Sequence, residues 1–287
     1  MRNAVGSSDR YRKSTKQHIE KMQRLLIEAV EQGAIGLSLG LEYAPGVDMD
    51  EVLELCSAVQ GRTILLSAHY RKDAKHSISS LQELINISKL SGFPMLVSHL
   101  GSCSAFGMIT ESLTLLQNAR DQGLDISADC YPYAAFSAFL GSAVFDPGCF
   151  ELWNKSYDSI LLTEAPYVGL RCDEALFYRV RQEQPDMLVV AFVMNEEEVA
   201  EALKAPFVMI ASDGLFRNGQ GHPRGAGTFP RVLGHYVRER RALSLLDALK
   251  KVTIMPAQRL GLANKGQIKE GFDADIVIFR EDDILDF

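Results

Sequence analysis

Residues 63–71 of the chain are TILLSAHYR, in which an apolar run ends on His69. The run predicts a short buried strand over TILLSA. MLVSH at 95–99 repeats the arrangement and places His99 30 residues after His69. A (β/α)8 barrel uses about 250 residues for eight strand–helix units, so one unit takes about 31 residues. The spacing of the two histidines therefore matches one unit, and both side chains would lie at the carboxyl ends of neighbouring strands.

Short apolar strands alternate with helical segments along most of the chain. We predict helices over 14–31, 48–60, 81–90, 110–122, 196–204, 244–252 and 256–262. Ser79 and Ser80, with Gln82 and Glu83 three residues later, predict a capping box at the third of these. The predicted strands are AIGLSLG (34–40), TILLSA (63–68), MLVSH (95–99), LDISADCYPY (124–133), LVVAFVM (188–194) and FVMIASD (207–213).

This alternation predicts an α/β fold with a parallel sheet, either doubly wound or a (β/α)8 barrel. The repeat between the histidines favours the barrel, and the sequence has no glycine-rich phosphate loop that would favour the doubly wound sheet. Only about six strands can be found, so we expect a barrel that lacks its first strands. From 134 onward the alternation of strands and helices stops. The sequence there is rich in aromatic residues, Pro and Gly, which predicts an insertion.

The composition is that of an ordinary globular protein, with 47% hydrophobic and 23% charged residues. A net charge of −7 argues against nucleic acid as a partner. No apolar run is long enough to cross a bilayer, and the first twenty residues lack the apolar core of a secretory signal. Five scattered cysteines without a CxxC pair argue against a disulfide framework. We therefore expect a cytoplasmic enzyme-sized protein.

Three predicted strand ends carry groups that can bind a metal or move a proton: His69, His99 and Asp213. Imidazoles and a carboxylate are normal Zn²⁺ ligands, and a catalytic zinc keeps one position open for water. The alternative is that each histidine is a structural residue at a strand end. Arg224, in the loop GHPRGAGTFPR (221–231), would clamp a carboxylate or lie at the surface. Tyr131 and Tyr133 would reach a substrate or pack in a turn, and Cys103 would be a ligand or a buried thiol.

Seven stretches together resemble the N-acyl-D-amino-acid deacylases, or D-aminoacylases, of the amidohydrolase superfamily. They occur in the order of that family and span nearly the whole chain. They are GAIGLSLGLEYAPG (33–46), SAHYR (67–71), VSH (97–99), DCYPYAA (129–135), ASDG (211–214), GHPRGAGTFPRVLGHYVRE (221–239) and GQIKEGFDADIVIF (266–279).

The resemblance implies a role for each candidate residue. His69 and His99 match the metal-ligating histidines of the fifth and sixth barrel strands. Asp213 matches the eighth-strand aspartate, which binds metal and acts as the general base. Tyr43, Tyr131 and Arg224 match positions that shape the substrate pocket and hold the α-carboxylate. The resemblance also implies a domain division into barrel units (1–133), an insertion (134–188), further barrel units (189–262) and strands of a small β-sandwich (263–287).

The departures from the family concern the metal and the substrate. The His-x-His pair of the first strand has no counterpart, and neither has the metal-bridging cysteine, so the chain resembles the C-terminal part of a deacylase. Gly101 stands where the family tends to have a carboxylate-binding lysine, and S-L-G replaces the usual S-T-G at 38–40.

We therefore expect a zinc-dependent hydrolase, with one or two ions, that cleaves a linear N-acyl-D-amino acid into a carboxylate and a D-amino acid. One rival interpretation is a catalytically silent chain that needs a homo-oligomer or a completing chain. Another is a hydrolase of cyclic amides, similar to dihydroorotases or hydantoinases.

Overall fold

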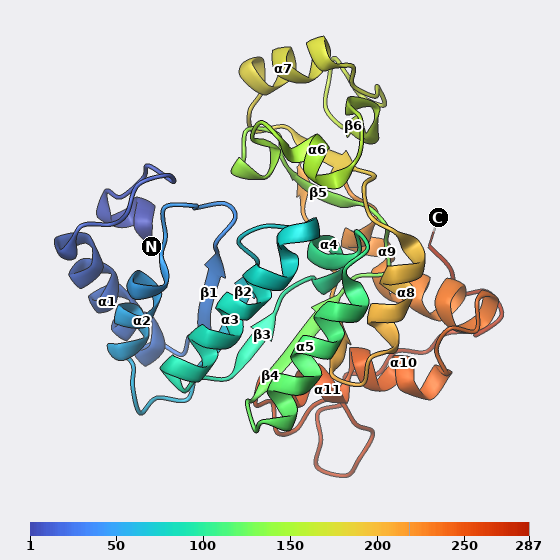
Figure 1. The fold of residues 1–287 in the computed structure, drawn as a ribbon. Coiled ribbons are helices and arrows are strands. Elements are labelled where there is room, and N and C mark those ends of the chain that lie inside the picture. Colours follow the sequence, from blue (N-terminus) through green and yellow to red (C-terminus); the bar gives the residue numbers. More distant parts are fainter. Residues whose placement is uncertain (218, 287) are drawn as a thin grey trace.

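A five-stranded parallel sheet forms the centre of the molecule (Figure 1). The computed structural model describes residues 1–217 and 219–286. The strands follow one another in the order β1-β2-β3-β4-β8, and each pair is parallel. An α/β fold with a parallel sheet is therefore confirmed. The strands are β1 (Gly36–Gly40), β2 (Leu65–His69), β3 (Met95–Val97), β4 (Ile126–Cys130) and β8 (Val208–Ile210).

Helices that connect these strands pack side by side in chain order along the sheet. Their bounds agree with the predicted segments to within a few residues, because apolar periodicity and terminal glycines mark them clearly. Gly92 and Gly123 end two of them with positive φ. These helices are α1 (Lys16–Glu31), α2 (Met49–Ser57), α3 (Ser77–Ser91), α5 (Ile109–Asp121) and α8 (Glu196–Lys204), with the short α4 (Leu100–Ser104) after β3.

Among the described residues, four helical segments follow β8. The helix α9 (Arg224–Arg231) continues directly into the π-helix η5 (Val232–Glu239), and α10 (Leu245–Val252) and α11 (Ile254–Arg259) follow. Arg259 from α11 donates to Asp125 Oδ1 at 2.5 Å, just before β4 begins. This pair ties α11 to the amino-terminal end of the sheet, opposite the end where His69 lies.

The predicted capping box of α3 is wrong. The helix begins at Ser77, three residues before the start that a box capped by Ser79 would give, and its first residue follows His76 without a side-chain cap. Ser79 lies inside the first turn and donates from its Oγ to the His76 carbonyl. The serines therefore continue the helix that a short 3-10 turn at Ala74–His76 has already started.

The insertion between β4 and α8 has its own sheet of antiparallel strands in the order β5-β7-β6. Its strands are β5 (Phe136–Phe139), β6 (Ile160–Leu162) and β7 (Leu188–Ala191), and its helices are α6 (Cys149–Trp153) and α7 (Glu174–Glu183). We predicted LVVAFVM as a barrel strand, and this is wrong because Leu188–Ala191 pairs with β5 and β6. A fully buried apolar run does not indicate which sheet it will join.

The segment 263–286 contains no helix or strand, so the predicted β-sandwich strands are not confirmed. Ile276, Val277 and Ile278 are 60%, 82% and 94% exposed, which is unusual for such an apolar run. Strands of this composition need neighbours to pair with and to pack on, and the described residues place none beside them. The end of the segment is held nevertheless, since Asp286 Oδ2 accepts from Tyr133 Oη at 2.9 Å.

No helix in the described part of the chain combines the length and the apolar character that crossing a membrane requires.

Candidate active site

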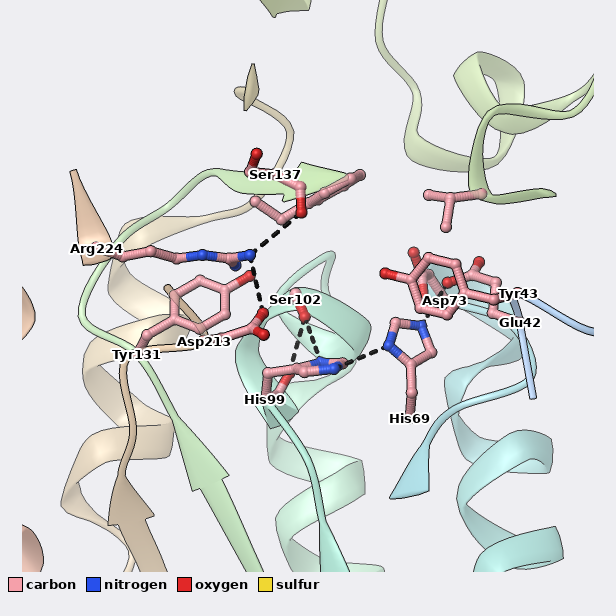
Figure 2. A pocket seen from close by; sticks show the side chains of 12 residues that line it. Glu42, Tyr43, His69, Asp73, His99, Ser102, Tyr131, Ser137, Asp213 and Arg224 are labelled. Carbon is pink, nitrogen blue, oxygen red and sulfur yellow. Dashed lines mark hydrogen bonds and ion pairs between the residues drawn. The ribbon is translucent and has the colours of Figure 1, made fainter. Parts of the chain in front are cut away.

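A small cavity lies at the carboxyl ends of the parallel strands, with the insertion over it (Figure 2). It adjoins a pocket of about 560 Å³ that shares Tyr43, His69, His99, Ser137, Asp213 and Arg224 with it. His69 ends β2, His99 follows β3, and Asp213 follows β8. The lining brings together the six residues that the sequence singles out: His69, His99, Asp213, Tyr43, Tyr131 and Arg224. The insertion adds the side chains of Phe136, Ser137 and Val144.

The backbone is strained at two of these strand ends. His99 has a φ of 37° and Asp213 a φ of 48°, and both lie in the left-handed region that non-glycine residues rarely adopt. Such conformations persist where surrounding structure enforces them, and they are concentrated at functional sites. The backbone N–H of His99 donates to Asp129 Oδ1 at 2.7 Å, which fixes the turn that carries the imidazole.

The two imidazoles are in direct contact, with 2.8 Å between His69 Nδ1 and His99 Nε2. Burial lowers the pKa of His69 to about 4. Burial and the neighbouring His69 lower the pKa of His99 to about 3. Both rings are therefore neutral near pH 7, which is the form in which histidine binds a metal.

The contacts continue on both sides of the histidine pair. Ser102 Oγ lies 2.8 Å from His99 Nδ1 and also donates to the His99 carbonyl at 2.9 Å. On the other side, His69 Nε2 lies 2.5 Å from Glu42 Oε2. Burial raises the pKa of Glu42 to about 8, so a proton is shared within this contact near neutral pH. Figure 2 shows Glu42, His69, His99 and Ser102 in one continuous row.

Arg224 and Asp213 form an ion pair on the opposite side of the cavity. Arg224 Nη2 lies 2.9 Å from Asp213 Oδ2 and also donates to the Ser137 carbonyl at 3.2 Å. The guanidinium lies over the Tyr131 ring, 4.4 Å from its centroid, and its Nε and Nη1 have no hydrogen-bond partner among the described residues. Arg224 is only 4% exposed, whereas Asp213 is 46% exposed. The arginine thus has two spare donors, and the carboxylate is open to the cavity.

The tyrosines contribute differently. The Tyr43 ring contacts the His69 ring, with 4.9 Å between their centroids, and is 40% exposed. Tyr131 is buried, and its Oη has no partner among the described residues. Tyr133, which the sequence left between two interpretations, lies away from the cavity lining and bonds Asp286 instead.

Four polar residues of the site were missed in the sequence: Glu42, Asp73, Ser102 and Ser137. Glu42 could have been found from the register of the parallel strands. Gly40 pairs with His69, and Glu42 follows Gly40 by two residues, so it lies near the end of the strand that carries His69. Asp73 and Ser102 follow the two histidines by four and three residues, so the loops after both strands carry residues of the site. Cys103 is buried, with its Sγ 3.6 Å from His99 Nδ1.

Gly101 is packed too tightly to be replaced by a larger residue. A Cβ at this position would lie 2.8 Å from Cys130 Sγ and 3.3 Å from Met194 Cε. Cys130 and Met194 therefore occupy the space that the first atoms of a lysine side chain at position 101 would need.

His222 should make the protein less stable in acid. Burial, followed by the charge of Arg224, lowers its pKa from 6.5 to about 3, and its Nδ1 accepts from the Arg224 N–H at 3.0 Å. The unfolded chain takes up a proton below pH 6.5 while the folded protein does not, so stability falls as the pH decreases from about 6.5 to about 3. We expect His222→Gln to make this slope shallower by up to about 1.4 kcal/mol per pH unit.

Urea unfolding at several pH values measures that slope. The exposed His76 provides the control, and His76→Gln should leave the slope unchanged. Equal slopes for the wild type and His222→Gln would contradict the prediction.

Comparison with known proteins shows that the chain is similar to amidohydrolases. Residues 173–287 match the model of the amidohydrolase family. The chain is 32% identical to D-aminoacylase from Alcaligenes xylosoxydans xylosoxydans over 285 residues, which is 97% of this chain and 58% of that protein. The chain therefore spans somewhat more than half the length of this relative.

Two solved structures show the same correspondence. The crystal structure of a D-aminoacylase superposes with a TM-score of 0.87 at 32% identity, covering 99% of this chain and 61% of the other. N-acyl-D-glutamate deacylase from Bordetella bronchiseptica superposes with a TM-score of 0.85 at 30% identity, covering 98% and 60%. That enzyme was crystallised with zinc and a phosphonate inhibitor that mimics the tetrahedral intermediate. The chain is thus similar, over nearly its whole length, to the C-terminal part of these deacylases.

Proposed function

We propose, from this similarity to the C-terminal part of the D-aminoacylases, that the chain is the catalytic portion of a metal-dependent hydrolase of N-acyl-D-amino acids. The observation that carries the proposal is the cavity itself. Two neutral imidazoles, an accessible carboxylate and a buried arginine with spare donors line one cavity at the carboxyl end of a parallel sheet. These are the groups that hydrolysis of an amide next to a carboxylate needs.

The fold of the complete enzyme is part of the proposal. We propose that the five parallel strands are the later strands of a (β/α)8 barrel whose first strands this chain lacks. The order β1-β2-β3-β4-β8 and the insertion between β4 and β8 support this interpretation. The exposed run at 276–278 would then be a strand of a β-sandwich whose partner strands are not among the described residues.

The residues suit a divalent metal ion. His69, His99 and Asp213 would supply two nitrogen ligands and one oxygen ligand, which is a normal set for zinc. The Asp213 carboxylate would have to move toward the histidines, because no Asp213 oxygen lies within 4.8 Å of both histidine nitrogens. At 2.8 Å the two imidazole nitrogens are at hydrogen-bond distance. The two nitrogens would have to move apart to hold one ion between them, since zinc–nitrogen distances are about 2.0–2.1 Å. When bound, zinc would polarise the amide carbonyl and lower the pKa of water.

Side chains of this chain would bind and orient the substrate. The spare Nε and Nη1 donors of Arg224 suit the α-carboxylate, and the Tyr131 ring keeps the guanidinium in place. Asp213 would take the proton from the attacking water and then protonate the leaving amine. Its Oδ2 is held by Arg224, which leaves Oδ1 for this transfer. Tyr43 would cover one side of the cavity beside His69.

A substrate panel tests the proposal. Protein loaded with Zn²⁺ should release amine from N-acetyl-D-methionine, and a chelator should abolish the release until Zn²⁺ is restored. N-acetyl-L-methionine should react at least about 10²-fold more slowly, because the mirror-image substrate cannot place both its carboxylate and its amide. Hydrolysis of dihydrouracil or hydantoin in preference to the acyl amino acid would instead support a cyclic-amide hydrolase.

The second candidate is a chain that is silent until a partner completes it. It rests on the sheet edges, since neither β1 nor β8 has a second neighbouring strand among the described residues. Open edges offer backbone groups to another strand. Light scattering after size exclusion distinguishes the two candidates. An active monomer would contradict the second one, and activity confined to an oligomer or to a complex with a completing chain would support it.

A further inference from the structure

Residues 280–286 lie against the π-helix η5, although they form neither a helix nor a strand. Arg238 of η5 donates from Nη1 to the carbonyls of Glu281 and Ile284, at 2.8 Å and 2.7 Å. Gly234 lies directly beneath the segment, since a Cβ there would clash with the Ile284 carbonyl oxygen. Ile284 also packs against the hydrophobic core. These contacts fix the course of the segment along η5.

The Asp286 carboxylate extends from this segment to a junction between α9 and the turn at 131–133. Its Oδ2 accepts from Tyr133 Oη at 2.9 Å and lies 3.6 Å from Arg231 Nη1. The Asp286 side chain is 12% exposed, so the contacts are mostly shielded from water. Gly227 leaves room for them, because a Cβ there would lie 2.5 Å from Tyr133 Oη and 2.8 Å from Asp286 Cβ. One carboxylate thus joins α9 to the turn.

This turn supports the side chain of Arg224. The Arg224 guanidinium lies over the Tyr131 ring, 4.4 Å from its centroid. Arg231 holds the turn from α9, because its Nε donates to the Pro132 carbonyl at 2.6 Å. Its guanidinium also lies 4.9 Å from the centroid of the Tyr133 ring. A shift of the turn would therefore move the ring that lies beneath Arg224.

A second route leads from Tyr133 to the backbone of Arg224. The Tyr133 ring meets the His222 ring edge-on, with 5.1 Å between their centroids. His222 Nδ1 accepts from the Arg224 N–H at 3.0 Å, where α9 begins. The side chain and the backbone of Arg224 are thus both held by neighbours of Tyr133. A two-pronged contact between a guanidinium and a carboxylate depends on such exact placement.

We propose that Asp286 is a positioning residue for Arg224, which acts through Tyr133 and Arg231 and does not touch the substrate. The inference rests on the proposed function, because it assigns Asp286 to the part of the site that would hold the substrate carboxylate. Loss of the Asp286 carboxylate should therefore weaken binding of substrates that carry this group and should change KM more than kcat.

The KM values of Asp286→Ala for N-acetyl-D-methionine and for its amide test the proposal. We expect KM for the acid to rise about 10-fold, as for one weakened hydrogen bond to a charged group, while kcat changes less than about 3-fold. KM for the amide, which has no carboxylate for Arg224, should stay unchanged. Asp283→Ala is the matched control. Asp283 lies in the same segment, is 54% exposed and pairs with Arg280, so its loss should change neither KM.

A double-mutant cycle separates positioning from a general effect on the structure. If Asp286 acts through Arg224, Asp286→Ala should raise the KM of Arg224→Lys less than about 2-fold further. Tyr133→Phe removes only the hydroxyl that donates to Asp286, and it should raise KM for the acid at least about 3-fold if Asp286→Ala folds poorly. Full additivity in the cycle, an equal rise for acid and amide, or an unchanged KM in Tyr133→Phe would overturn the proposal.

Calorimetric titration with N-acetyl-D-methionine distinguishes failure of this inference from failure of the proposed function, because it measures binding without turnover. A wild type that binds the ligand without hydrolysing it, and binds it about 10-fold more weakly after Asp286→Ala, would contradict only the proposed function. Binding that Arg224→Lys weakens and Asp286→Ala leaves unchanged would overturn the inference, whatever the turnover. A wild type that does not bind the ligand would overturn both.

Discussion

Asp213→Asn is expected to lower the kcat of amide hydrolysis by about 10²–10⁴-fold, the range typical of a lost general acid–base group. The asparagine side chain has the same size but cannot accept the proton of the attacking water at neutral pH. Asparagine also tolerates the left-handed backbone, so the φ of 48° at this position should be preserved. Steady-state kinetics with the Zn²⁺-loaded protein and N-acetyl-D-methionine measure the effect.

Asp125→Asn is the matched control. It too removes an aspartate that is paired with an arginine, Arg259, but at the amino-terminal end of the sheet. It should leave kcat unchanged, whatever it does to the Tm. If Asp213→Asn retained more than about a tenth of wild-type turnover while folding normally, Asp213 would not be the proton acceptor.

Arg224→Lys is expected to raise the KM for the acyl amino acid by about 10–10²-fold, corresponding to the 1.5–3 kcal/mol of a hydrogen bond to a charged group. Lysine keeps the positive charge but lacks the planar fork and stacks less well on Tyr131. This increase in KM should depend on the carboxylate of the substrate. An N-acetyl-D-methionine amide, which has none, should be affected little by the substitution.

Arg171→Lys is the control for this variant. Arg171 also stacks on an aromatic ring, 4.5 Å from the Phe192 centroid, but it lies in the insertion and does not line the cavity. Its substitution should leave both KM values unchanged. If Arg224→Lys raised KM equally for the acid and the amide substrate, Arg224 would support the structure of the cavity and would not bind the carboxylate.

The parallel sheet and the two histidines were predictable because each strand is short, apolar and followed directly by a polar residue. The 30-residue repeat placed His69 and His99 on adjacent strands, and the structure joins them at 2.8 Å. Arg224 was less certain, since a loop arginine in a sequence carries no sign of burial. Only the tertiary structure shows it to be 4% exposed and paired with Asp213.

Other features needed three-dimensional information. The pairing of Leu188–Ala191 with the insertion depends on β5 and β6 lying on either side of it, and an apolar run does not record this. Glu42 and Asp73 have the composition of ordinary loop acids, and their burial arises because the insertion and the loops after β1 and β2 enclose them. The exposed 276–278 run has strand composition but no neighbour to pair with in the described chain.

The hydrogen bonds in the row from Ser102 to Glu42 depend on one another for which atom donates and which accepts. The Ser102 hydroxyl has one hydrogen and two acceptors within reach, the His99 carbonyl and His99 Nδ1. When the hydrogen goes to the carbonyl, the hydroxyl oxygen accepts from Nδ1–H of His99. The Nε2 atom of His99 is then the bare nitrogen that receives Nδ1–H of His69, which leaves Nε2 of His69 as the basic atom. In this arrangement one backbone oxygen at the start of α4 selects the tautomer of both imidazoles. The selected lone pair points toward the Glu42 and Asp73 side. An ion held between His69 Nδ1 and His99 Nε2 would then require the His69 proton to move to Nε2, beside Glu42.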